Sequence, residues 1–388
     1  MHRFGNSETE SIHVRLTART AFANGMQGIY MEDQKERFAE LDFIRFFAAL
    51  SVVIYHYKSK YIESLVDSPA LAKGIYSIAK FGYLGVDLFF IISGYVIFAS
   101  ALGRTGTQFA ISRITRLYPT LWVCVSITTL IAVFLRGPDN NITFIQWLAN
   151  LTLFNSRMGI EDIDGVYWTL AVEVKFYFCV FALLTFNLLR YHRVWITIWL
   201  ATTISFCLFK QPFFLGWFIS PEYSANFIAG IVFCLARRDG YTRFHVAILV
   251  PSLAVSSFYA YYAISTFARG VTELDRLIAV GIVWCLFSLF YLISARKFTM
   301  RSTAFVLGLG GMTYPLYLLH NRAGKDLYDA LAGTIPSLAL VFLVTIFMLL
   351  MSWFIHMYLE RGIANRLKSY LFSLSQRISA LHGGQATK

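Results

Sequence analysis

One arginine and one histidine stand eleven residues apart in the apolar stretch 41–61, at Arg45 and His56. Eleven residues of α-helix complete about three turns, so both side chains share one face, roughly 16 Å apart along the axis. A histidine within a membrane helix is costly unless it is used, and a neutral imidazole near pH 7 suits general-base chemistry on a hydroxyl. We therefore take His56 as the candidate catalytic base. The alternative is a core histidine bonded to a backbone carbonyl.

Two acidic residues also lie within apolar stretches: Asp87 in GYLGVDLFFIISGYVIF and Glu173 in VYWTLAVEVKFYF. Charged groups inside a membrane usually face the bundle interior or a wet cavity. A carboxylate from either position would hold the second nitrogen of His56 and stabilise the imidazolium that forms. We predict both as catalytic residues. The alternative is that they pair with other buried charges or reach water, as the long stem of Lys175 allows that residue to do.

Arg113 and Arg116 stand three residues apart in ISRITRLYPTLW. Helical neighbours at that spacing project together, and the planar guanidinium binds phosphate with two hydrogen bonds. The pair predicts a site for a phosphate-bearing ligand. The alternative is contact with anionic lipid and marking of membrane topology. His320 and His356 are expected to pack at an interface, although either would be able to join the site.

The composition indicates that lipid surrounds this chain. Of its 388 residues, 57% are hydrophobic and only 14% charged, with a mean hydropathy of +0.57, whereas soluble domains carry about 25% charged residues. We assign the net charge of +12 to cytoplasmic loops and not to nucleic-acid binding. The five cysteines lie in apolar runs without CxxC or Cys/His clusters, so we expect small buried hydrophobes, not disulfides or metal ligands.

Ten apolar segments approach the roughly 20 residues that span a bilayer. They are 43–61, 82–102, 117–135, 166–188, 194–209, 214–235, 245–264, 277–294, 304–320 and 337–358. Pro221 interrupts the sixth and Pro315 the ninth, so we expect broken or short helices that line a cavity there. The predicted fold class is an all-α polytopic membrane protein with about ten transmembrane helices in one bundle.

The distribution of charge predicts that both termini are cytoplasmic. Four loops that would then lie inside hold eleven basic residues against one acid, Asp239; they are 103–116, 189–193, 236–244 and 295–303. This is the positive-inside bias. Residues 1–40 lack the apolar region of a signal peptide. We divide the chain into a polar cytoplasmic arm (1–40), a membrane domain (41–360) and a basic cytoplasmic tail (361–388).

Five stretches follow one another in an order known from one family: LDFIRFFAALSVVIYHY, FGYLGVDLFFIISGYVI, ISRITRLYPTLW, VYWTLAVEVKFYF and TYPLYLLH. Together they cover most of residues 41–360. They resemble the acyltransferase 3 family of integral membrane acyltransferases, which includes O-acetylases of O-antigen, exopolysaccharide and other cell-envelope polysaccharides. The resemblance implies a ten-helix core in the bacterial cytoplasmic membrane. It also implies acyl-CoA, often acetyl-CoA, as donor and a saccharide or lipid-linked glycan as acceptor.

The family's motifs fall on particular residues of this chain. Its R-x10-H pattern falls on Arg45 and His56, its R-x-x-R pair on Arg113 and Arg116, and its W-S-L-x-x-E-like stretch on Trp168, Thr169, Leu170 and Glu173. Thr169 replaces the usual serine and keeps the hydroxyl. Near the end, Glu360, Arg361 and Gly362 depart from the family's glutamate-x-proline. Some members carry a fused extracytoplasmic esterase-like domain, which we do not expect here because the sequence ends soon after the last segment.

We therefore expect acyl-CoA to bind Arg113 and Arg116 with help from Arg45, and His56 to deprotonate a sugar hydroxyl or to relay the acyl group covalently. One rival is a proton-coupled transporter or flippase of a lipid-linked saccharide, although no internal symmetry between halves supports it. Another is a non-catalytic scaffold or sensor. Tyr61 and the acidic residues at 161–164 are expected in solvated loops.

Overall fold

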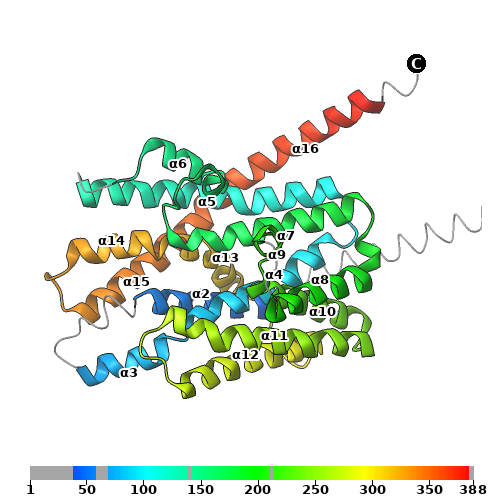
Figure 1. The fold of residues 1–388 in the computed structure, drawn as a ribbon. Helices are drawn as coiled ribbons and strands as arrows, with labels where there is room; N and C mark the ends of the chain where they lie inside the picture. The colour runs from blue at the N-terminus through cyan, green and yellow to red at the C-terminus, as the bar shows by residue number, and fades with distance from the viewer. Residues whose placement is uncertain (1–37, 58–68, 138–140, 210–212, 384–388) are drawn as a thin grey trace, which may run out of the picture.

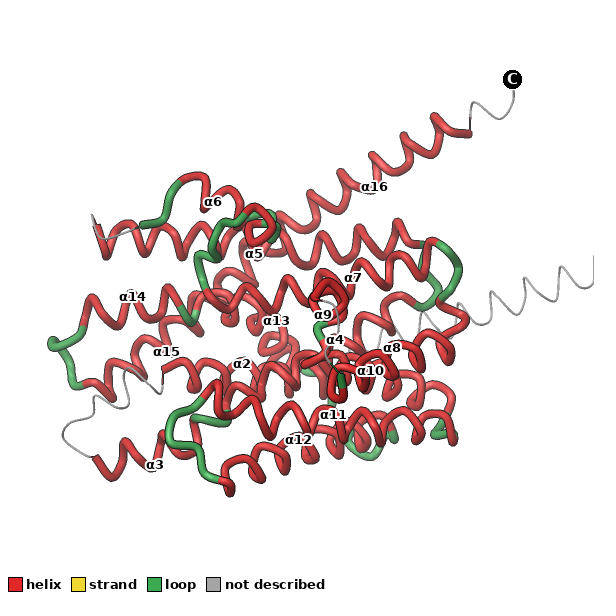
Figure 2. The backbone as a smooth tube through the Cα atoms, viewed as in Figure 1, coloured by secondary structure: helices red, strands yellow, loops and turns green. Residues whose placement is uncertain are grey.

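The computed structural model describes residues 38–57, 69–137, 141–209 and 213–383 (Figure 1). This part of the chain is helical and contains no strand (Figure 2). Residues 1–37 of the predicted polar arm, the end of the first predicted segment and Tyr61 lie outside the described residues. The predicted all-α class is confirmed for the rest.

The helices, in chain order, are α2 (Ala39–Tyr57), α3 (Pro69–Ala79), α4 (Gly85–Ala101), α5 (Gly106–Arg136), α6 (Phe144–Asn150), α7 (Trp168–Thr185), α8 (His192–Leu208), α9 (Phe213–Ile219), α10 (Pro221–Asp239), α11 (Arg243–Phe267), α12 (Glu273–Ser294), α13 (Ala304–Leu319), α14 (Arg322–Leu331), α15 (Ser337–Phe354), a π-helical turn (Ile355–Glu360) and α16 (Arg361–Gly383). Most run along one common direction, and α16 projects away from the bundle (Figure 1).

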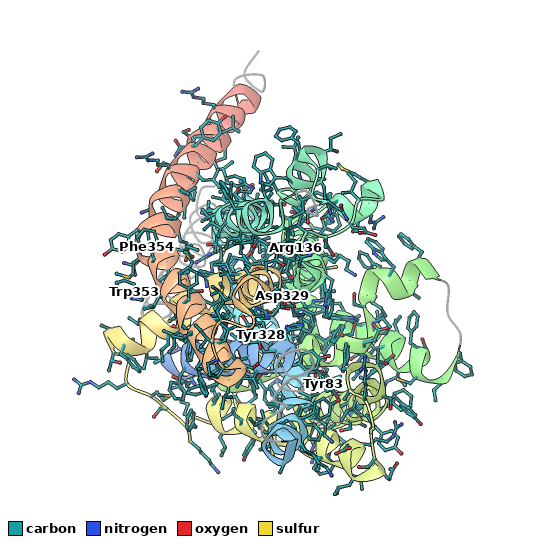
Figure 3. The ribbon with its side chains drawn as sticks, turned by 90° about the vertical axis from the view of Figure 1, so that its left-hand side faces the viewer. Tyr83, Arg136, Tyr328, Asp329, Trp353 and Phe354 are labelled. Carbon is teal, nitrogen blue, oxygen red and sulfur yellow. The ribbon has the colours of Figure 1, made fainter. Side chains whose placement is uncertain are left out.

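Six helical stretches of the described chain are long and apolar enough to cross a membrane. They are Ala72–Ala101, Gly106–Arg136, Gly165–Thr185, Arg243–Phe267, Glu273–Ser294 and Ser337–Arg377, and α13 is a shorter apolar helix. Viewed along the bundle from its α14 end, Trp353 and Phe354 of α15 point outward, whereas Tyr328 lies inside (Figure 3). Apolar aromatic side chains on the outer surface suit contact with lipid. The chain is therefore a multi-pass membrane protein.

Three differences from the expected segments bear on the site. Helix α5 begins at Gly106, well before residue 117, because Thr105 and Gln108 form a capping box at its start. Arg113 and Arg116 therefore lie within a helix, not in a loop. The helices α3, α6 and α14 were not predicted, because they are shorter than a membrane span. The last segment continues through the π-helical turn into α16.

The sixth predicted segment is broken, as expected from Pro221. Helix α9 ends before Ser220, whose φ of 48° lies in the left-handed region, and α10 begins at Pro221, a favoured first helical residue. The ammonium of Lys175 donates to the carbonyl of Trp217 (2.6 Å) and to the hydroxyl of Ser220 (2.7 Å). Lys175 thus fixes the break between the two helices through a carbonyl and a hydroxyl, and these partners are not the buried charge considered in the sequence analysis.

The cysteine prediction is partly wrong. All five thiols are free, and Cys124 and Cys234 are buried. Cys285, however, is exposed on the outer face of α12, beside the exposed Trp284. An apolar run does not distinguish a lipid-facing position from a buried one, since both favour apolar side chains.

The core of the bundle is the contact between α4 and α10. Almost every residue of α10 from Ser224 to Ala236 is buried. The two backbones approach closely because Gly94 and Gly230 face each other: a Cβ at Gly94 would collide with the carbonyl of Phe227, and one at Gly230 with the carbonyl of Ile91. Small residues at such crossings allow close van der Waals packing in membranes. This crossing carries Asp87, which lines a cavity described below, and Asn226, which donates a hydrogen bond to Asp87.

We predict that Gly230→Ala lowers the free energy of unfolding by about 1–3 kcal/mol, because the added methyl group overpacks the α4–α10 crossing. Thermal unfolding of the purified protein in detergent measures the change. Gly281→Ala is the matched control, since a Cβ at this helical glycine meets nothing within 4 Å; alanine there should be neutral or stabilising. Equal stability of the two variants would contradict the packing argument.

Candidate functional site

The first cavity has a volume of about 470 Å³ and is lined by an unusual number of arginines. We call it the arginine pocket, defined by its six arginines Arg45, Arg104, Arg113, Arg116, Arg237 and Arg238. The carboxyl groups of Asp42 and Glu173 also line it. Three of the six, Arg45, Arg113 and Arg116, are the arginines that the sequence analysis expects to bind the donor. The other three come from the α4–α5 connection and from the end of α10, which sequence spacing alone does not place beside α2.

Arg113 carries an unused donor in this pocket. Its Nη2 donates to Ser112 (3.2 Å), and its guanidinium lies 5.8 Å from the ring centroids of Phe109 and Tyr177. Its buried Nε has no hydrogen-bond partner in the described chain. Buried donors are nearly always paired, so an orphaned guanidinium N–H is costly. An anionic ligand in the pocket would supply the missing acceptor.

A chain of paired side chains runs along one wall of the arginine pocket. Arg116 Nη1 lies 3.0 Å from Glu360 Oε1, and Glu360 Oε2 lies 2.8 Å from His356 Nδ1. His356 lines the pocket and packs on Gly311, where any Cβ would collide with its ring. The expected interfacial position of His356 is therefore wrong. The π-helical turn carries this pair, and π-helical turns occur often at functional sites.

Glu173 also belongs to the arginine pocket. Its Oε1 accepts hydrogen bonds from Tyr177 (2.8 Å) and Ser93 (3.2 Å). The structure therefore places Glu173 with Arg45, Arg113 and Arg116 and apart from the cavity that holds His56.

The second cavity, of about 400 Å³, contains His56 together with two carboxyl groups and many aromatic rings. We call it the histidine pocket, defined by His56, Asp87, Trp168, Glu222, Tyr223 and Tyr259. Its volume lies within the range of roughly 300–1,000 Å³ that is usual for small-molecule sites. Arg45 and His56, predicted on one face of one helix, thus line two different cavities.

The ring of His56 is held by a second histidine, which sequence reasoning had placed elsewhere. His56 Nδ1 lies 2.8 Å from Nε2 of His320, which is fully buried. Nδ1 of His320 faces the carbonyl oxygens of Tyr317 (2.8 Å) and Leu316 (3.1 Å), and Tyr57 donates to the carbonyl of His320 (2.8 Å). The expected interfacial packing of His320 is therefore wrong.

These contacts assign the tautomers of two neutral rings. A carbonyl oxygen only accepts, so Nδ1 of His320 carries the proton and its Nε2 is an acceptor. His56 then donates from Nδ1, and the basic lone pair of His56 is on Nε2. This is the protonation state that a general base needs.

Neither predicted carboxylate occupies the Nδ1 side of His56. Asp87 Oδ1 accepts instead from the side-chain amide of Asn226 (2.8 Å), whose own oxygen accepts from Ser256 (2.8 Å). Asp87 still lines the histidine pocket with His56. The structure brings Asp87 and His56 together in one cavity, with His320 in the place where we had expected a carboxylate.

The predicted solvated loop around 161–164 is partly wrong as well. Asp164 is only 1% exposed. It accepts from the amide of Asn321 (2.6 Å), the backbone N–H of Arg322 (2.7 Å) and that of Val166 (3.1 Å). Burial raises the pKa of Asp164, while these donors act in the opposite direction. Asp164 thereby fixes the chain just after His320; its place before a helical turn, typical of a cap, was the available sequence signal.

The two pockets share two lining residues, Val86 and Tyr317. The hydroxyl of Tyr317 lies 2.9 Å from Thr169 Oγ1, and Thr169 donates to the carbonyl of Val166 (3.0 Å). The hydroxyl that Thr169 keeps at the position of the family's serine is thus used at this boundary. One side of the boundary is rich in guanidinium groups, and His56 lies on the other.

Comparison with known proteins gives three results. The profile of an acyltransferase domain matches residues 38–357. Peptidoglycan O-acetyltransferase OatA of Listeria monocytogenes is 29% identical over 158 residues, 35% of this chain and 22% of that protein. O-acetyltransferase OatA of Staphylococcus aureus is 29% identical over 171 residues (39% and 25%), and Nodulation protein 10 of Rhizobium leguminosarum bv. viciae is 26% identical over 156 residues (35% and 41%). Each match spans less than half of the relative's length. No solved structure matches the chain.

We predict that Asp164→Ala lowers the free energy of unfolding by about 3 kcal/mol, because two buried backbone N–H groups and the Asn321 amide lose their acceptor. Asp162→Ala is the matched control: Asp162 is half-buried and accepts one hydrogen bond, from Asn155 (2.8 Å), so about 1 kcal/mol is expected. Thermal unfolding measures both changes, and backbone amide exchange at residues 166 and 322 reports the loss of the Asp164 acceptor. Unchanged exchange in Asp164→Ala would contradict its anchoring role.

Proposed function

Because this chain belongs to the acyltransferase 3 family of membrane proteins, we propose that it is an O-acyltransferase that moves an acyl group, acetyl as in its named relatives, from acyl-CoA to a saccharide hydroxyl. One observation carries the proposal: a pocket lined by six arginines and a pocket lined by His56, whose ring is held by His320, share the lining residues Val86 and Tyr317. The acceptor is a cell-surface or exported glycan, in keeping with the peptidoglycan named for one relative.

The arginine pocket is proposed to bind the donor. Coenzyme A carries three phosphate groups, and guanidinium groups bind phosphate. Four of the six arginines (Arg45, Arg116, Arg237 and Arg238) also pair with a carboxylate. The orphaned Nε of Arg113 supports this assignment because it lacks the acceptor that a phosphate oxygen offers. Arg45 and Arg116, the other predicted ligands, line the same cavity. Glu173, fixed by Tyr177 and Ser93, would position the pantetheine end or one of the arginines.

The histidine pocket is proposed to carry out the proton transfer. Nε2 of His56 takes the proton of the sugar hydroxyl as its oxygen attacks the thioester carbon, and the C–S bond then breaks to release coenzyme A. The resulting imidazolium of His56 keeps its Nδ1–H bond to His320. His320 in turn points at carbonyls in the last turn of α13, where the helix dipole favours positive charge. A covalent acyl relay through the protein remains the alternative route.

Asp87 would hold an acceptor hydroxyl in the same pocket, since a carboxylate is a strong acceptor for sugar O–H groups. Asn226 and Ser256 fix its orientation. In this scheme Asp87 touches the substrate and does not orient the imidazole, which is the role that the sequence predicts for it.

We further propose about ten membrane spans with both termini cytoplasmic, in a bacterial inner membrane. The six long apolar stretches and four shorter helices, α2, α8, α10 and α13, sum to that number. The basic loops then lie inside with the arginine pocket, where cytoplasmic acyl-CoA enters. Membership in an acyltransferase family favours this function over a proton-coupled saccharide transporter that uses the same histidines.

We predict that His56→Ala lowers acyl transfer by about 10²–10⁴-fold, because the general base is lost. Transfer of labelled acetyl from acetyl-CoA to glycan in isolated membranes measures the effect. His320→Gln should retain part of the activity and shift its pH profile, as expected for a residue that acts through His56. His192→Ala, a histidine in neither pocket, is the control. Substantial activity of His56→Ala at normal expression would reject its role.

We predict that Arg113→Ala combined with Arg116→Ala raises KM for acetyl-CoA at least about tenfold, because each lost charged hydrogen bond contributes about 1.5–3 kcal/mol. KM for the glycan should change little. Arg243→Ala with Arg301→Ala is the matched control, since neither arginine lines the pocket. Wild-type protein should also bind 3′-dephospho-coenzyme A more weakly than coenzyme A. An equal rise in both KM values would argue against donor binding at these arginines.

A further inference from the structure

We propose that the histidine pocket accepts a sugar that is uncharged or carries an amino group, and that it rejects sugars bearing a carboxylate. This inference rests on the proposed function, because it assumes that the acceptor hydroxyl reaches His56 in this cavity. It narrows the acceptor from saccharides in general to one charge class. The argument uses the rings, the charges and the polarity of the two cavities.

Aromatic rings form most of the surface that a sugar would touch. The cavity is lined by Tyr55, Tyr83, Trp168, Tyr223, Tyr259 and Phe267, among others. Trp168 and Tyr223 stack with centroids 5.3 Å apart and planes inclined by 36°, and Tyr83 and Phe267 lie 4.8 Å apart at 31°. Such rings offer an apolar surface for the C–H face of a pyranose. The hydroxyls of Tyr55, Tyr83 and Tyr317 bond protein groups. The pocket therefore fits a sugar ring.

The charges in the pocket are acidic. Asp87 and Glu222 line it, and apart from His56 the described lining residues include no basic side chain. Asp87 lies in the first turn of α4 and Glu222 in the first turn of α10, so each carboxyl group extends from the backbone of a helix. A carboxylate on the sugar would meet like charge at the half-buried Asp87 and at the exposed Glu222, and like-charge juxtaposition opposes binding.

The nearby lysines do not line the cavity beside these carboxyl groups. Lys175 interacts electrostatically with Glu222, but its ammonium donates to Trp217 and Ser220. Lys80 pairs with Asp275 at 2.6 Å. Neither lysine lines the pocket. The arginine pocket has the opposite polarity, with six guanidinium groups. The protein thus separates an anion-binding cavity for the donor from an acidic, aromatic cavity for the acceptor.

The test uses three matched glycans with the full chain in lipid nanodiscs: β-1,4-linked tetrasaccharides of glucose, of glucosamine and of glucuronate. Binding is measured by isothermal titration, and transfer is measured separately with labelled acetyl-CoA. We expect the glucose and glucosamine forms to bind at least about tenfold more tightly than the glucuronate form. In the transfer assay, kcat/KM should be higher for the glucose and glucosamine forms than for the glucuronate form.

Two variants test the cause of the preference. Glu222→Gln should lower the ratio of the Kd for the glucuronate form to the Kd for the glucose form by about threefold. Glu222→Lys should lower this ratio further, because the like charge is removed in the first variant and reversed in the second. Glu161→Gln is the matched control: Glu161 is exposed and does not line the pocket, so the ratio should not change. A ratio that is insensitive to Glu222 would overturn the electrostatic explanation.

Measuring binding and transfer separately distinguishes failure of this inference from failure of the proposed acyltransferase function. Equal binding of all three glycans overturns the inference, whether or not acetyl is transferred. Preferential binding of glucose and glucosamine without any transfer supports the charge selection and counts against the proposed acyltransferase activity. Preferential binding of glucuronate overturns the inference and leaves the function in place if transfer occurs.

Discussion

The hydrogen bond between His56 and His320 is the interaction on which the candidate site depends. It joins the end of α2 to the end of α13, and it determines which nitrogen of His56 carries the lone pair. A carboxylate would hold the ring as well, but it would bury a full negative charge. A neutral histidine set against helix-terminal carbonyls gives the same orientation and places partial negative charge where an imidazolium would form. Asp164 and Tyr57 hold the segment that bears His320.

Close packing of backbones makes this arrangement possible in a helical bundle. Glycines occur where helices cross: Gly94 against α10, Gly311 against His356, and Gly324 against the hydroxyl of Tyr57. Each removes a side chain that would otherwise push two helices apart. The space gained is used for polar side chains, which reach partners on neighbouring helices and do not face lipid.

The two cavities have opposite electrostatic character although they share Val86 and Tyr317. Guanidinium groups gather in one, and their carboxylate partners are too few to neutralise them. Carboxyl groups and aromatic rings gather in the other. A protein that moves an acyl group from a phosphate-rich donor to a saccharide needs both environments within reach of one reacting carbon. The two shared lining residues bring the cavities next to each other. Family membership and the opposite charge of the two cavities therefore both support the proposed O-acyltransferase function.

The sequence by itself determined the helical class, the family and the residue types of the site, because hydropathy and local spacing are encoded in short stretches. It also placed Arg113 beside Arg116, since neighbours on one helix need no tertiary information. Only the tertiary structure decided that His320 and not Glu173 meets His56, and that Arg104 and Arg237 line the arginine pocket. These pairings link residues far apart along the chain through helix crossings, and the positions of the crossings depend on packing of whole helices. No local sequence pattern predicts how whole helices pack against one another.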